Sequence, residues 1–298
     1  MPGQIRIGIS GWSYKPWRGV FYPEDLTQKK ELAYAASQFS SIEINGTFYS
    51  LQRPSSFATW AEQTPPGFVF SIKASRYITH MLRLRNVEQP LANFFASGLL
   101  ALGSKLGPIL WQFPPNFQFN PELLEEFFAL LPRDTYAAAT LATKHDERLK
   151  GRAYIDSGSR RAVRHAIEIR HPSFVVPEFV SLLRRYNVAL VCADTVEWPL
   201  LMDVTADFVY CRLHGSEVLY TSGYSDQALD QWAARVATWA GGGEVTDGDH
   251  ASPKPARKRA ARDVFVYFDN DANVFPPKDA RALTQRVEKL FSSEAPTL

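Results

Sequence analysis

The chain has 298 residues, of which 45% are hydrophobic and 21% are charged. This composition excludes a wholly disordered chain and supplies enough apolar side chains for a large core. The 33 lysines and arginines nearly balance the 31 aspartates and glutamates. The resulting net charge of +2 gives no global attraction to nucleic acid or to an anionic membrane, so any such attraction must be local.

No apolar run reaches the roughly 18 residues that a membrane-spanning helix needs. The first residues also lack the basic and apolar regions of a signal peptide. The two cysteines, Cys192 and Cys211, are too few for a disulfide scaffold and form no CxxC zinc motif. We therefore expect a cytoplasmic protein without membrane contact.

Eight short β-rich runs alternate with longer stretches of helical periodicity. The predicted strands are Ile5–Ser10, Ser41–Asn45, Phe68–Lys73, Pro108–Phe113, Ala166–Arg170, Ala189–Asp194, Phe208–His214 and Val264–Asp269. The predicted helices are Gln28–Phe39, Ser55–Gln63, Val87–Lys105, Pro121–Leu131, Val176–Tyr186, Asp226–Ala240 and Lys278–Phe291, and the short connection Asp194–Asp207 has only a doubtful helix. The alternation favours a single α/β domain, a TIM-type (β/α)8 barrel. A doubly wound open sheet is the alternative, although no GxGxxG motif follows the first strand.

Two segments interrupt this alternation and are predicted as insertions. Residues 137–164 are polar, mixed and basic. Residues 241–262 begin with three glycines and lack apolar periodicity, which predicts a mobile segment. That segment ends in a basic cluster, and this cluster is a candidate contact for nucleic acid or another polyanion: Lys254, Arg257, Lys258, Arg259 and Arg262.

Side chains alternate between the two faces of a strand, so the apolar parity should face the helices and the opposite parity the barrel lumen. At the carboxyl-terminal ends of the strands the lumen parity is polar throughout: Ser10, Glu43, Asn45, Ser71, Lys73, Gln112, Glu168, Arg170, Asp194, Arg212, His214 and Asp269. Active sites of such barrels lie at this end. Because unpaired buried charges are costly, these groups must pair with one another or bind a ligand.

Seven sequence blocks, in order, resemble the YecE-like family, a TIM-barrel family of unknown function. They are SGWSYKPWRGVFYP (Ser10–Pro23), EINGTFY (Glu43–Tyr49), ITH (Ile78–His80), LGPILWQFPP (Leu106–Pro115), EIRHPSF (Glu168–Phe174), YCRLHG (Tyr210–Gly215) and YFDND (Tyr267–Asp271). The resemblance implies a barrel with these blocks around one pocket, but it implies no reaction. Asp269 stands where this family usually has Asn, which adds a negative charge.

The leading hypothesis is an enzyme that performs acid–base chemistry on an anionic small molecule, without a metal or cofactor. Glu43, Glu168 and His214 are the candidate catalytic residues. Arginine and lysine side chains suit a phosphate or carboxylate group. The candidate substrate-binding residues are Trp12, Asn45, Tyr49, Lys73, Gln112, Arg170, Asp194, Arg212 and Asp269.

Two alternatives remain open. The first is a non-catalytic nucleic-acid-binding barrel, in which rim aromatics stack on bases and the basic cluster contacts phosphates. The second is a metal-dependent phosphoesterase or isomerase that resembles endonuclease IV at the level of the fold. Its ligands would come from His80 and from the acidic and histidine groups of the strand ends: Glu43, Glu168, His171, Asp194, His214 and Asp269.

Overall fold

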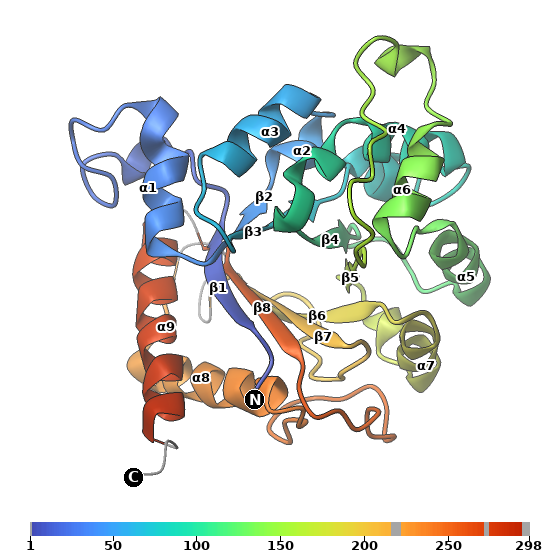
Figure 1. Ribbon diagram of the computed structural model, residues 1–298. Coiled ribbons are helices and arrows are strands. Elements are labelled where there is room, and N and C mark those ends of the chain that lie inside the picture. Colours follow the sequence, from blue (N-terminus) through green and yellow to red (C-terminus); the bar gives the residue numbers. More distant parts are fainter. Residues whose placement is uncertain (1, 216–221, 271–273, 294–298) are drawn as a thin grey trace.

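The computed structural model describes residues 2–215, 222–270 and 274–293, and its eight strands close into a parallel barrel (Figure 1). The strands follow one another around the barrel in chain order, and β8 pairs with β1. Their bounds are β1 Ile5–Ser10, β2 Ser41–Ile44, β3 Val69–Lys73, β4 Leu106–Gln112, β5 His165–Glu168, β6 Ala189–Asp194, β7 Phe208–Leu213 and β8 Asp263–Phe268. The predicted (β/α)8 barrel is confirmed, and the open-sheet alternative is wrong because the sheet has no free edge.

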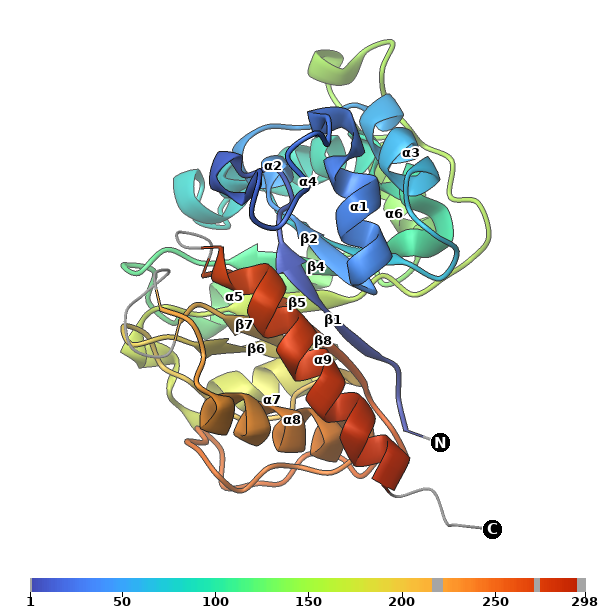
Figure 2. The same ribbon diagram turned by 90° about the vertical axis from the view of Figure 1, so that its left-hand side faces the viewer.

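Helices surround the strands and cover their outer faces (Figures 1 and 2). The α-helices are α1 Glu31–Gln38, α2 Gly46–Tyr49, α3 Pro54–Glu62, α4 Glu88–Ala96, α5 Pro121–Leu130, α6 Thr135–Ala142, α7 Pro177–Tyr186, α8 Asp226–Ala240 and α9 Phe275–Ser293. The connection between β6 and β7 contains no helix, which the doubtful periodicity there anticipated. The main core lies between the barrel and this helical layer.

Two helical regions differ from their predictions. The helix predicted over Val87–Lys105 is divided at Gly98, whose φ of 118° ends α4 before a 3-10 segment, Leu99–Lys105. Helix α6 was not predicted, although it covers the start of the segment read as an insertion. Asp134 caps it by accepting a hydrogen bond from the Ala137 amide at 2.8 Å, and α6 packs against α4.

The lumen has its own small apolar cluster, and its members confirm the parity assigned to most strands. Large side chains come from β7 and β8, where Phe208, Tyr210, Phe265 and Tyr267 point inward. Small ones come from β5 and β6, which contribute Ala166, Ala189, Val191 and Ala193. This layer fills the barrel below the polar strand ends, so the polar groups form the floor of a closed-bottomed mouth rather than a channel.

The parity predicted for β6 is wrong. Ala193 is paired with Arg212 and points into the lumen, whereas Asp194 is paired with Leu213 and faces the helices. Cys192 likewise belongs to the outer core. The alternation rule failed here because both parities of β6 below Asp194 are apolar, so the sequence gives no contrast between the two faces.

Candidate active site

Eight parallel strands bring their carboxyl-terminal ends to one mouth, and a buried arginine lies at its centre. The guanidinium of Arg212, on β7, has no exposed surface. Its Nε and Nη2 donate to the two carboxylate oxygens of Glu43 at 3.1 and 2.9 Å. Its Nη1 donates to Glu168 at 2.6 Å, and Nη2 also donates to Asp269 at 2.7 Å. One cation therefore holds three carboxylates from β2, β5 and the end of β8.

The Glu43 carboxylate is completed by two hydroxyl groups. Ser10 Oγ donates to Oε1 at 2.5 Å, and Tyr210 donates to Oε2 at 2.6 Å. Burial and the adjacent Glu43 charge raise the pKa of Tyr210 well above its ordinary value, so this phenol stays protonated and acts as a donor. Asn45, directly after β2, donates through Nδ2 to Ser10 at 2.9 Å. Glu43 is thus fixed by hydrogen bonds from side chains on β1 and β7.

Glu168 has a second set of partners on its outer side. Gln112 Nε2 donates to Oε1 at 2.8 Å, and Arg170 Nε donates to the same oxygen at 2.9 Å. Burial opposes ionisation of Glu168, but the charges of Arg212 and Arg170 outweigh it and hold the pKa of this carboxyl well below its ordinary value. The Arg170 guanidinium in turn stacks on Trp198 at 3.8 Å from the ring centroid.

Asp269 and His214 form a pair at the end of β8 and β7. His214 Nδ1 lies 3.2 Å from Asp269 Oδ2, the oxygen that also accepts from Arg212. His214 Nε2 lies 3.3 Å from Arg212 Nη1. Burial would raise the pKa of Asp269, but Arg212 and His214 keep it below its ordinary value, so Asp269 is a carboxylate. Among the described residues, both contacts to this carboxylate are made at Oδ2, and none is made at Oδ1.

Lys73, at the end of β3, differs from the two arginines. Its Nζ lies 4.6 Å from the Phe48 ring centroid, and within the described part of the chain it has no hydrogen bond or ion pair. Burial and the charge of Arg212 lower the pKa of this ammonium, against the opposing effect of Asp269, Glu43 and Glu168. His80 stands on the other side of Phe48, with ring centroids 5.1 Å apart. Burial, Arg170 and Lys73 lower the pKa of His80 to about 4, so it is neutral near pH 7.

Exposure divides these residues into a floor and a rim. The side chains of Glu43, Glu168, Arg212 and His214 have no exposed surface. Asp269 and Arg170 each expose 12% of theirs, and Lys73, Asn45, His80 and Trp198 are half-buried. A ligand entering the mouth would meet this second group first. The sequence prediction had listed floor and rim together, because alternation gives the face of a side chain and not its depth.

Three predicted binding residues lie outside this cluster. Asp194 faces the helices and accepts a hydrogen bond from Trp232 Nε1 of α8 at 2.9 Å. Trp12 packs on the outer layer, edge-on to Trp60 of α3 with centroids 5.4 Å apart. Tyr49 is 67% exposed at the end of α2, with the Arg76 guanidinium 5.4 Å from its ring centroid. The structure brings together the other predicted residues: Glu43, Asn45, Lys73, Gln112, Glu168, Arg170, Arg212, His214 and Asp269.

Two contributors were missed in the sequence. Tyr210 has lumen parity two residues before Arg212, so side-chain alternation along β7 is enough to place it in the lumen. Trp198 lies in the loop after β6, and no periodic pattern marks a loop residue that folds back over the mouth. It contacts Arg170 and stands edge-on to His214 with centroids 6.0 Å apart.

Four of the side chains proposed as metal ligands meet at the mouth, but they gather around the Arg212 guanidinium: Glu43, Glu168, His214 and Asp269. No group of three or more such side chains suited to a metal ion occurs among the described residues. At the centre of the mouth the three carboxylates already surround the Arg212 guanidinium, whose charge repels a second cation. His171 instead bonds Ser173 in its own loop, with Nδ1 2.9 Å from Oγ. The donor set therefore does not fit a resident metal.

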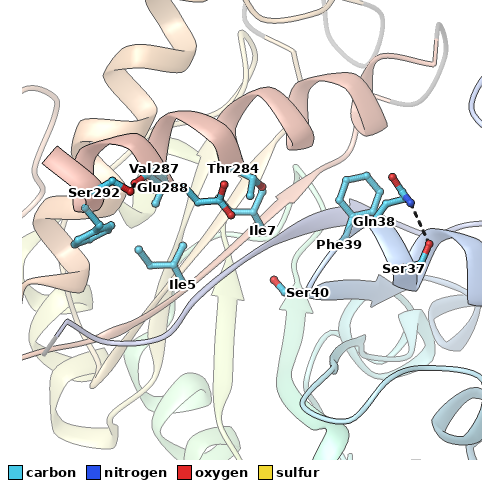
Figure 3. Close-up of a pocket in the computed structure, with 11 residues that line it drawn as sticks. Ile5, Ile7, Ser37, Gln38, Phe39, Ser40, Thr284, Val287, Glu288 and Ser292 are labelled. Carbon is cyan, nitrogen blue, oxygen red and sulfur yellow. Dashed lines mark hydrogen bonds between the residues drawn. The ribbon is translucent and has the colours of Figure 1, made fainter. Parts of the chain in front are cut away.

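Other features of the described residues add little to this site. A cavity of ≈ 600 Å³ lies at the opposite end of the strands, where Thr284, Val287 and Glu288 of α9 face Ile5 and Ile7 of β1 (Figure 3). Its lining contains one titratable side chain, Glu288. The cavity is a gap in the packing between α9 and the barrel. In the part of the chain that the structure covers, no helix has both the length and the apolar character needed to cross a membrane.

Two curated bacterial proteins are similar in sequence to part of this chain. The chain is 30% identical to UPF0759 protein YunF of Bacillus subtilis over 40% of its own length and 43% of that protein. It is 30% identical to UPF0759 protein YecE of Escherichia coli over 38% and 39%, respectively. The matched part thus spans less than half the length of these curated relatives.

Solved structures match over nearly the whole chain. A DUF72 family protein from Thermotoga maritima has a TM-score of 0.72 and 24% identity, covering 96% of this chain and 99% of that one. A DUF72 family protein from Enterococcus faecalis has a TM-score of 0.69 and 18% identity, covering 96% of both chains. The model of the family described as "Protein of unknown function DUF72" matches residues 6–297. The barrel with its polar mouth therefore belongs to the DUF72 family.

Proposed function

We propose that this protein is an enzyme that performs acid–base chemistry on an anionic small molecule bound at the mouth of the barrel. The molecule carries a phosphate or a carboxylate group. The observation that carries the proposal is Lys73, a half-buried cation that forms no ion pair with any described residue, beside the paired Arg212 and Arg170. An anionic ligand supplies the missing counter-charge.

Asp269 is our candidate for proton transfer. It is the one carboxylate of the described Arg212 cluster with an exposed edge, and Oδ1 is left for a substrate. Its ionised state suits a base rather than an acid. His214 and Arg212 both hold Oδ2, which fixes the direction of Oδ1. A substrate with its anionic group on Lys73 and an acidic C–H or O–H toward Oδ1 fits this arrangement.

The floor is assigned a positioning role. Glu43 and Glu168 have no exposed surface, and they hold Arg212 from opposite sides of the barrel. Four of the five N–H groups of Arg212 donate to these carboxylates and to Asp269, and the second N–H of Nη1 faces His214 Nε2 at 3.3 Å, so none is left over for a ligand. Such an arrangement is electrostatically preorganised, since no dipole has to reorient when substrate charge develops.

The proposal is tested by screening phosphorylated sugars, mononucleotides and carboxylic acids for thermal stabilisation of the wild-type protein, followed by proton NMR of each ligand in D2O. We expect at least one anionic ligand to stabilise the protein and to exchange a C–H proton for deuterium. Lys73→Met should lower affinity by about tenfold or more, the value of one charge-assisted contact. Asp269→Asn should keep binding and abolish exchange.

Lys73→Arg is the matched control, because arginine keeps the positive charge at all accessible pH values. Wild-type affinity should fall as the pH rises, beginning below the range where a lysine ordinarily loses its proton, since burial lowers the pKa of Lys73. The Lys73→Arg variant should bind without this alkaline loss. Equal affinity in wild type and Lys73→Met would reject Lys73 as the anion contact, and exchange that survives Asp269→Asn would reject Asp269 as the base.

A further inference from the structure

The basic segment 241–262 lies far from the mouth. It leads from the end of α8 to the start of β8, at the end of the barrel where the strands begin (Figure 1). A surface that combines the aromatic rim with this basic cluster, as the nucleic-acid hypothesis required, is therefore not formed. In barrels of this type the end where strands begin serves stability rather than catalysis, so a concentration of arginines there calls for its own explanation.

A cavity of ≈ 220 Å³ opens between this segment, the end of α7 and the residues just before β7. Four arginines line it, and no aspartate or glutamate does: Arg184, Arg257, Arg259 and Arg262. Asn187 adds an amide group at its edge. Glu244, whose charge acts on Arg262, accepts from the Ala256 amide at 2.9 Å, and Asp207 accepts from Asn187 at 3.1 Å, and neither side chain lines the cavity.

Arg262 shows that the cavity is built and not merely a loose surface patch. It is only 2% exposed, and its Nη groups donate to the carbonyls of Gly242, Gly243 and Arg257. Its Nε is buried and has no hydrogen-bond partner among the described residues. A buried, charged donor without an acceptor is costly, so the protein gains stability when an anion reaches it.

Of the other arginines, Arg184 is held in place by hydrogen bonds, and Arg257 and Arg259 are exposed and can close on a ligand. Arg184 donates to the carbonyls of Val204 and Lys254 at 3.1 and 2.9 Å, which ties α7 to the basic segment. Arg257 and Arg259 are exposed, and their guanidinium groups form no ion pair within the described ranges. Arginine presents a planar fork of donors that matches the oxygens of a phosphate.

We propose that this cavity is a phosphate-binding site, separate from the active site, that takes one phosphate group between Arg262 at its base and Arg257 and Arg259 at its edge. The group belongs either to a small phosphorylated molecule or to the backbone of a nucleic acid strand. Both sources share the same chemistry, and the dependence of binding on salt separates them.

The test uses the full chain carrying Lys73→Met, which weakens the proposed anion contact at the mouth; the ionic strength of the chloride buffer is fixed for phosphate and varied for DNA. Inorganic phosphate is titrated and followed by phosphorus NMR, and a short fluorescent single-stranded DNA oligonucleotide is followed by anisotropy. We expect saturable phosphate binding by the Lys73→Met protein and an affinity lower by about tenfold or more when Arg257→Gln/Arg259→Gln is added. Both substitutions are at exposed positions, so an unchanged melting temperature verifies that the fold is intact.

Lys258→Gln is the matched control, because Lys258 is exposed in the same segment and does not line the cavity. It should leave phosphate affinity unchanged. If DNA also binds, and the double variant flattens its salt dependence, the source is a nucleic acid; if only phosphate binds, the source is a small molecule. Absence of phosphate binding, equal binding by the double variant, or an equal loss in Lys258→Gln would overturn the proposal.

Discussion

The imidazole of His165 is sealed into the outer core at the start of β5, with no exposed surface. Its Nε2–H donates to the Pro132 carbonyl at 2.8 Å, and its Nδ1 accepts from Trp111 Nε1 at 3.1 Å. Burial lowers the pKa of His165 to about 3. Protonation would place a donor at Nδ1 opposite the indole N–H, so the folded protein keeps this ring neutral.

His165 should therefore contribute to a loss of folding stability at acidic pH. Between about pH 6.5, the ordinary pKa of histidine, and the folded value of about 3, the unfolded chain binds a proton that the folded chain does not. The free energy of unfolding then falls as the pH falls across this window. Urea denaturation at several pH values should show a steeper fall for wild type than for His165→Gln. Substitution of the exposed His250 should keep the wild-type slope, and parallel curves for wild type and His165→Gln would contradict the assignment.

The sequence correctly predicted the lumen position of a charged residue where that residue stands between two apolar residues of the same strand. Glu43 between Ile42 and Ile44, and Glu168 between Ile167 and Ile169, could be placed in the lumen with no structure. Asp194 could not, because its strand is apolar on both faces. The hydrogen-bond partner of each charged side chain could not be predicted either. Arg212 and Glu43 are 169 residues apart in the sequence, and no local pattern encodes their contact.

At the scale of elements, Gly98 decides where α4 stops. Its φ of 118° is one that side chains rarely adopt, and an added Cβ would lie 2.5 Å from the Pro54 Cα at the start of α3. Propensity alone favours a longer helix, which is why the sequence predicted one. The break comes instead from the close approach of two helices, a tertiary constraint that helical periodicity does not report.

Gly98→Ala should consequently destabilise the protein by more than backbone strain alone. Gly67 is the comparison, because its φ of 78° is also left-handed but an added Cβ there meets no atom within 4 Å. We expect Gly67→Ala to cost about 1–2 kcal/mol, and Gly98→Ala to cost more, because α3 or α4 must shift as well. Urea denaturation of both variants measures this difference. Equal losses would mean that the contact with Pro54 relaxes freely.

At the scale of the whole molecule, barrel closure separates the two proposed sites. The mouth lies where the strands end and the arginine cavity where they begin, so a strand length of roughly 20 Å stands between them. Alternation of eight strands and helices was enough to predict this architecture, because few folds accommodate that pattern. The position of the basic segment at the far end also follows from its place between a helix and the next strand.

Because the two sites share no residue, substitutions at them should act independently. The triple variant Lys73→Met/Arg257→Gln/Arg259→Gln should show a change in the free energy of unfolding equal to the sum of its parts within about 0.5 kcal/mol. Phosphate affinity at the arginine cavity should be the same with Lys73 or Met at the mouth. A coupling clearly above that limit, measured by denaturation and phosphorus NMR, would show that the barrel transmits a signal along its strands.

The contact between Arg212 and Asp269 has a consequence for divergence within the family. In relatives with Asn at the position of Asp269 and the same arginine, the mouth would have one negative charge fewer around the guanidinium. Their substrates should then carry a different charge, or the residue at the Lys73 position should change in the same lineage. We expect the residue at this one position to separate DUF72 proteins that bind different ligands, and a ligand found for this chain should be sought first among relatives that share its aspartate.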